Sequence, residues 1–240
     1  MACTPVGVLL LLAAASACAP APPGLVQTGT LPPGGTISVT NLRGNVSVYA
    51  PARGQSSSAF TLDATGPNAG RDVIVRRSGN RVTIATRGLG TDLLIRGPKG
   101  TVINVRALSG NINAADFDGV VNASTDRGDI KMLLPQYGNA NAGTGNVSVI
   151  FASTKWPGTL HFGSQHGDVE LYVNQTASAK VDLAAMDGTI FTDFPLKGTA
   201  HGLSEMIEGT INSPALHSKR RIDAFVRDGS IRLLQLKPQM

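Results

Sequence analysis

The sequence predicts an all-β protein: a single-stranded, β-helix-like solenoid with coils of roughly 20 residues and an N-terminal hairpin or cap. The first observation is composition, because 28 glycines with only 15% charged and 5% aromatic residues are typical of many short strands joined by tight turns. The second is a repeat in which a polar residue, Gly, one of Asn, Asp, Thr or Ser, and then Ile or Val recur eight times. Regular recurrence of this kind predicts stacked coils.

Residues 1–17 are predicted to be a signal peptide. The apolar stretch Val6–Ala17 has the length of the hydrophobic region of such a peptide and is too short to span a bilayer as a helix. It ends in Ala15-Ser16-Ala17-Cys18, which resembles the lipobox of bacterial lipoproteins. We therefore expect Cys18 to carry the lipid, for example palmitate. The same three small residues also match an ordinary cleavage site, which leaves cleavage without lipidation as the alternative.

Residues 18–34 are predicted to be a lipidated tether. The run Ala19-Pro20-Ala21-Pro22-Pro23-Gly24 is proline-rich, and such segments are extended and semi-rigid. We expect an exported protein of the cell envelope, anchored through its N-terminal lipid on the periplasmic side of the outer membrane or at the cell surface.

Residues 35–240 contain the repeat and are predicted to form one repetitive all-β solenoid domain. The repeat glycines are expected to be structural corners, because Gly readily adopts the positive φ of a sharp turn, and the polar residue that follows can bond nearby backbone. These glycines are Gly44, Gly110, Gly128, Gly145, Gly167, Gly188, Gly209 and Gly229. From Gly110 onward they are separated by 18, 17, 22, 21, 21 and 20 residues.

A strand is expected after each corner. Alternating apolar residues such as Ile130 and Met132 would point inward and stack on the next coil, since one coil is too short to bury its own apolar face. Near the N-terminus, Asp72–Arg77 and Arg81–Thr86 flank Ser78-Gly79-Asn80 and predict a β-hairpin.

These repeats, the lipobox and the ending around Ile207-Glu208-Gly209-Thr210-Ile211 and Asp228-Gly229-Ser230-Ile231 resemble the bacterial putative-adhesin family of toast-rack β-solenoid domains. Head GIN-domain adhesins are similar to it. The resemblance covers roughly residues 35 to 235. It implies an envelope-attached fold and supplies no catalytic residues.

Catalytic, metal and cofactor sites are not expected. Both cysteines, Cys3 and Cys18, precede the repeats, and the chain lacks a nucleophile elbow, a Ser-x-x-Lys pair, a His-Glu-x-x-His motif and a phosphate-binding loop. His161, His166, Asp168 and Glu170 could be arranged as metal ligands, but His166 occupies a variable corner position, which favours a solvated side chain. Asp168, Asp187 and Asp228 could serve glycoside cleavage, but each is explained by a corner. The net charge of +5 is spread along the chain, so nucleic acid is not an expected partner.

The sequence therefore predicts a non-catalytic, adhesin-like binding or scaffolding lipoprotein. Its partners would be the membrane, through the lipid, and an envelope protein, lipid or wall polymer. Trp156, Tyr137 and Lys155 are the candidate binding surface, because the loop-rich segments Tyr137–Ala142 and Ala152–Thr159 contain them. The alternatives are a β-helical glycan-active enzyme and a structural solenoid that self-associates through exposed terminal coils.

Overall fold

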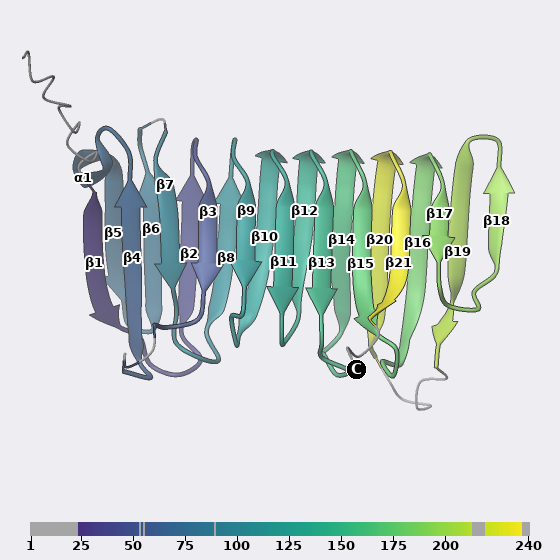
Figure 1. The fold of residues 1–240 in the computed structure, drawn as a ribbon, viewed down its shortest axis with the longest axis horizontal. Coiled ribbons are helices and arrows are strands. Elements are labelled where there is room, and N and C mark those ends of the chain that lie inside the picture. Colours follow the sequence, from purple (N-terminus) through teal and green to yellow (C-terminus); the bar gives the residue numbers. More distant parts are fainter. Residues whose placement is uncertain (1–23, 53, 55, 89, 213–218, 237–240) are drawn as a thin grey trace, which may run out of the picture.

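The computed structural model describes residues 24–52, 54, 56–88, 90–212 and 219–236, and the predicted signal peptide and Cys18 lie outside them. Two long sheets, mostly parallel, pack face to face around one apolar core (Figure 1). The prediction of an all-β, solenoid-like protein is thus confirmed. Among the described residues the only helix is the four-residue α1, Ala69–Asp72, and no helix is long and apolar enough to cross a membrane.

The strands of the described chain fall into two sheets, which we call sheet A and sheet B. In spatial order, sheet A contains β1 Leu25–Thr30, β4 Ala59–Thr65, β7 Asp92–Arg96, β3 Val46–Tyr49, β9 Ile112–Ala115, β11 Ile130–Leu134, β13 Val147–Phe151, β15 Val169–Asn174, β21 Ile231–Leu236 and β17 Ile190–Thr192. Sheet B contains β18 Gly198–His201, β19 Ser204–Ile211, β16 Ala179–Asp187, β20 Arg221–Asp228, β14 Thr159–His166, β12 Gly138–Thr144, β10 Val120–Arg127, β8 Val102–Ala107, β2 Thr36–Asn41, β6 Arg81–Thr86 and β5 Val73–Ser78.

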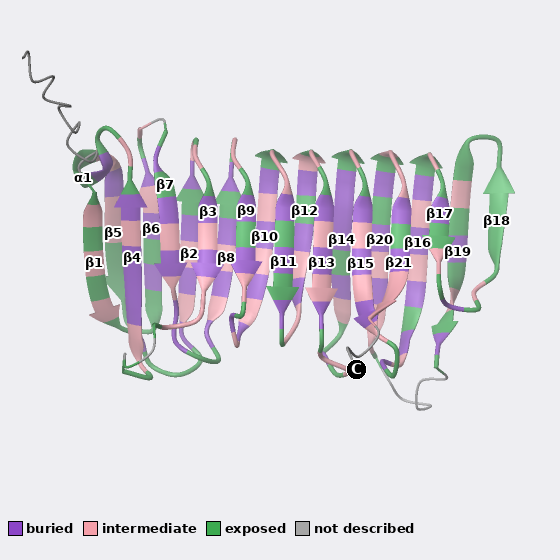
Figure 2. Cartoon of the chain, in the orientation of Figure 1, coloured by how far each residue is buried: buried purple, intermediate pink, exposed green. Residues whose placement is uncertain are grey.

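Each coil consists of a strand of sheet B, a corner and a strand of sheet A, as in β10–β11. Neighbouring coils pair in parallel, so that equivalent residues stack; Ile112, Ile130 and Val147 are in register and completely or almost completely buried. Inward and outward positions alternate along most strands of the coils (Figure 2). The apolar alternation seen in the sequence is therefore the wall of the core.

The coils do not follow one another in chain order. At one end, β20–β21 lies between β14–β15 and β16–β17, so that the last coil of the chain is an interior coil of the stack. At the other end, β2–β3 lies between β6–β7 and β8–β9. The order of the coils in the stack therefore differs from their order in the chain.

Both ends of sheet B finish in antiparallel strands. The predicted hairpin is confirmed as β5–β6, in which Val73 pairs with Thr86 and Gly79 has a φ of +56°. At the opposite end, β19 returns antiparallel to β16 and then pairs with β18, whose four residues are all exposed (Figure 2).

Candidate functional site

The corner glycines form a column along one edge of the two sheets. Gly44, Gly110, Gly128, Gly145, Gly167 and Gly229 all have φ between +124° and +146°. In each of the last five, an added Cβ would run into the carbonyl group of the corner glycine in the neighbouring coil. Glycine is thus required twice, by the backbone conformation and by the close approach of the next coil.

A ladder of side-chain hydrogen bonds follows the glycine column. The side chain directly after most corner glycines accepts a bond from the equivalent backbone N–H of the next coil. Asp92, which follows Thr91, is the first acceptor, and in this ladder Ser230 only donates. The steps run from Asp92 to Asn45, Asn111, Asp129, Asn146, Asp168 and Ser230, with distances of 2.6–3.0 Å. The sequence predicted a bond to nearby backbone; the bond instead joins coils, because the corners lie directly above one another.

Two of the predicted corners differ from the rest. Gly188 lies at a corner next to Gly229, but its φ is outside the range of +124° to +146° that the other corner glycines share. Gly209 lies inside β19, which runs antiparallel to β16, so it is not a corner. The motif around Gly209 matches the repeat because a Gly-Thr-Ile stretch also suits a strand of a terminal hairpin.

Trp156 was predicted to be part of a binding surface, but the structure buries it. Its side chain is only 5% exposed, its ring packs edge-on against Phe151 at 5.6 Å, and its indole N–H donates to the Arg221 carbonyl at 3.3 Å. Tyr137 is half-buried against the core and Lys155 is exposed. Trp156 is therefore part of the core. The loop that contains it, just before Pro157-Gly158, folds inward.

The outer face of sheet B offers a more extensive surface, and its first feature is a row of polar side chains, which we call the outer row. Equivalent positions on eight neighbouring strands carry Ser38, Asn104, Asn122, Asn139, His161, Asp223, Asp182 and Glu208. Sequence reasoning missed it because these residues are separated by long stretches of chain and only the register brings them together.

The three asparagines of the outer row are half-buried and bonded to one another. The Asn122 amide donates to Asn104 Oδ1 at 2.9 Å, and the Asn139 amide donates to Asn122 Oδ1 at 2.7 Å. Asn139 Oδ1 in turn accepts the backbone N–H of His161 at 2.8 Å. The amides are thus fixed in orientation, each with hydrogen-bonding capacity left over. They line a shallow hollow of about 350 Å³ together with Ser38, Thr40, Arg106, Ser124 and Asn141.

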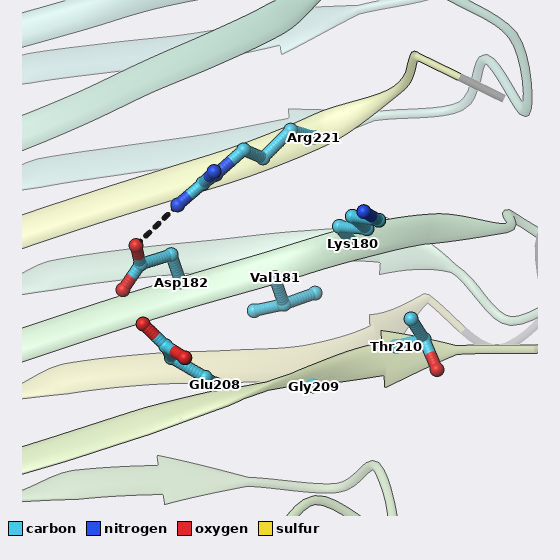
Figure 3. Close-up of a pocket in the computed structure, with 7 residues that line it drawn as sticks. All are labelled: Lys180, Val181, Asp182, Glu208, Gly209, Thr210 and Arg221. Atoms are coloured by element: carbon cyan, nitrogen blue, oxygen red, sulfur yellow. Dashed lines mark hydrogen bonds and ion pairs between the residues drawn. The ribbon is translucent and has the colours of Figure 1, made fainter.

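The far end of the outer row is charged (Figure 3). Arg221 forms ion pairs with Asp182 and with Asp223, the latter at 2.5 Å, and these bonds raise the pKa of the guanidinium. Figure 3 shows the Glu208 carboxylate beside that of Asp182, to which its strand is paired. Arg221, Asp182 and Glu208 line an open hollow of about 450 Å³, together with Lys180, Val181, Gly209 and Thr210.

A second row lies beside the first on the same face and includes an exposed aromatic ring. Phe225 is 37% exposed, and its in-register neighbours are the small residues Gly163 and Ala184. Asn141 is paired with Gly163 on the other side, and its Oδ1 would lie 2.9 Å from a Cβ placed there. The Asn141 amide therefore covers Gly163 and connects the asparagine hollow to the ring.

The register brings some of the other candidate ligands and carboxylates together. His166, Asp228 and Asp187 are equivalent positions on neighbouring strands of sheet B, and His161 Nδ1 lies 3.7 Å from Asp223. His166 Nδ1 lies 2.6 Å from Asp228, Glu170 accepts the Tyr172 hydroxyl at 3.2 Å, and Asp168 belongs to the corner ladder. Asp187 is exposed next to its corner. Within the described part of the chain, no group of three or more His, Cys, Asp or Glu side chains is placed to hold a metal ion.

No family model matches the chain, and no curated protein matches its sequence. Several solved structures do. A putative cell adhesion protein from Clostridium sporogenes matches with a TM-score of 0.48 at 11% identity, over 89% of this chain and 100% of that one. A putative adhesin from Bacteroides fragilis matches with a TM-score of 0.38 at 10% identity, over 89% and 97% of the two chains. One from Parabacteroides distasonis matches with a TM-score of 0.27 at 9% identity, over 90% and 98%.

Proposed function

We propose that this chain is a non-catalytic, adhesin-like binding or scaffolding module that is exported, tethered to the envelope through Cys18, and binds its partner on the outer face of sheet B. The observation that carries the proposal is the outer row: polar side chains lie in register on eight neighbouring strands, and the three asparagines among them are bonded to one another. Such a surface is rigid and extended, which suits recognition of an extended partner.

The charges on this face also favour binding over catalysis. Asp182 and Asp223 both bond to Arg221, so neither is held as a free acid or base beside an enclosed pocket. The two hollows of the face are shallow and open, whereas catalytic sites are usually concave and shielded from water.

The tether is tested by cell fractionation. We expect the wild-type protein in the membrane fraction and the Cys18→Ser variant in the soluble fraction, because each buried methylene of an acyl chain contributes about 0.8 kcal/mol to membrane binding. Mass spectrometry of the mature N-terminus measures the lipid directly. A soluble wild-type protein with an unmodified Cys18 would contradict the tether.

The binding role is tested by adding the purified protein to isolated envelopes and measuring both retention and released products. We expect saturable retention with no release of sugar or peptide. Loss of retention in a variant of the outer face, with retention kept in a variant of the opposite face, would assign the surface. Turnover that a single Asp, Glu or His substitution abolishes would replace this proposal with an enzyme.

A further inference from the structure

The outer face of sheet B has the chemistry of a carbohydrate-binding surface, and we propose that its ligand is an uncharged, extended glycan of pyranose units lying across the strands. This inference rests on the proposed function, because it names the partner class of the same face. Three observations carry it: the fixed amides, the exposed ring and the charge balance.

The amides supply the polar half of the recognition. A sugar hydroxyl is both a donor and an acceptor, and a primary amide offers both kinds of group in one plane. In the asparagine ladder one donor and one acceptor of Asn122 are already committed to its neighbours, which fixes the directions of the remaining N–H and lone pair. Little side-chain conformational entropy is therefore lost when a ligand binds to these amides.

The ring supplies the apolar half. Ala224 and Val226 are buried, so Phe225 between them projects from the outer face of the strand. The residues on either side of it in the sheet, Gly163 and Ala184, are too short to cover the ring. A pyranose has an apolar C–H face and a rim of hydroxyls, so it can stack on Phe225 while the Asn141 amide bonds the rim.

The charges exclude the competing ligands. The asparagine hollow has one cation, Arg106, and the charged end has three carboxylates, Asp182, Asp223 and Glu208, against Lys180 and Arg221. Nucleic acid and anionic lipid both require a cluster of cations, which neither hollow provides. A peptide strand would add to a sheet edge, where backbone groups are free, and not to the middle of a face.

The dimensions of the face suit a polymer. The outer row crosses eight strands from Ser38 to Glu208, and seven intervals of about 4.8 Å give a length of about 34 Å. A chain of several sugars can therefore contact the asparagine hollow, Phe225 and the charged end together, and affinity should rise with chain length.

The experiment is calorimetric titration of the detergent-solubilised full-length protein with neutral β-1,4-linked glucose and N-acetylglucosamine oligomers of two and six units. We expect one of the hexamers to bind, at least tenfold more tightly than its dimer, and Phe225→Ala to weaken it at least tenfold. Asn122→Ala, which removes amide bonds and little volume, is the second variant and should also weaken it.

The matched controls lie on the outer face of sheet A. Phe191→Ala removes a ring that is 54% exposed there, and Asn113→Ala removes an exposed amide; neither should change affinity. Thermal melting checks that all four variants are folded. Equal losses in both sets of variants, no hexamer binding at millimolar concentration, or binding only to phosphatidylglycerol vesicles would overturn the glycan assignment while leaving a non-catalytic binding role intact. Hexamer binding followed by release of shorter sugars would support the glycan assignment and overturn the non-catalytic role.

Discussion

Replacing a corner glycine tests the stacking of coils most directly, and Gly128→Ala is the most informative change. Gly128 has a φ of +140°, and its added Cβ would lie 2.6 Å from the Gly110 carbonyl carbon. Carbon atoms in contact are about 3.5–4.0 Å apart, so the two coils must separate locally by about 1 Å. Gly100→Ala is the matched control, because Gly100 also has a positive φ, +75°, but no atom lies within 4 Å of its Cβ position.

The expected cost follows from the bonds at this corner. Backbone strain in a glycine-only conformation costs about 1–3 kcal/mol. Separation of the coils also weakens the bond from Gly110 N to the Arg127 carbonyl at 2.8 Å and the bond from Asp129 N to Asn111 Oδ1 at 2.9 Å, each worth about 0.5–1.5 kcal/mol. The total loss for Gly128→Ala is about 2–6 kcal/mol, against about 1–2 kcal/mol for Gly100→Ala.

Urea unfolding followed by circular dichroism measures both losses. We expect Gly128→Ala to lose at least about 1 kcal/mol more than Gly100→Ala, and its Tm to fall further, by about 2–4 °C for each additional kcal/mol. Equal unfolding free energies for the two variants would refute the argument that the close approach of neighbouring coils, and not backbone conformation alone, requires glycine at the corners.

Three further predictions follow from buried and charged contacts. Trp156→Ala should lower the free energy of unfolding by about 3–5 kcal/mol, because it empties part of the core next to Phe151; a melting temperature like that of the wild type would contradict this. Ile130→Ala should cost about 2–5 kcal/mol in the same assay, because Ile130 is completely buried, and an unchanged urea midpoint would argue against its inward position. Asp118→Asn should cost little, because the partner Lys99 is mostly exposed. Its small effect should be present near neutral pH and vanish in acid, because bonds from Lys99 and Gln136 lower the pKa of Asp118, and stabilisation by such a group is lost as pH falls through that pKa; an effect that persists in acid would oppose this.

The sequence was most informative where local geometry repeats. A corner places the same demands on Gly110, Gly128 and Gly145, so the pattern recurs in the chain and the all-β, solenoid-like fold could be predicted from it. The hairpin at Gly79 was equally local. Gly209 shows the limit of such a pattern, since a four-residue match does not distinguish a corner from a strand interior.

The outer row of sheet B and the burial of Trp156 could not be predicted in this way. Asn122 and Asp182 share a row only because β20–β21 is inserted into the stack, and that insertion depends on pairing between strands far apart in the chain. The neighbouring Pro157 and Gly158 indicate that Trp156 lies in a loop, but its burial depends on contacts with Phe151 and Arg221. Both features depend on tertiary contacts, and neither produces a periodic pattern in the sequence.

The insertion of the last coil also determines when the molecule can be completed during synthesis. A chain made from its N-terminus contains β14–β15 and β16–β17 before β20–β21, yet the strands of these two coils pair with β20–β21 and not with each other. The strand pairing between these two coils can therefore be completed only when residues 221–236 arrive. The C-terminal strands β20 and β21 complete the two sheets by pairing on both sides. A chain cut before Arg221 would lose this interior coil and expose two unpaired strand edges in each sheet.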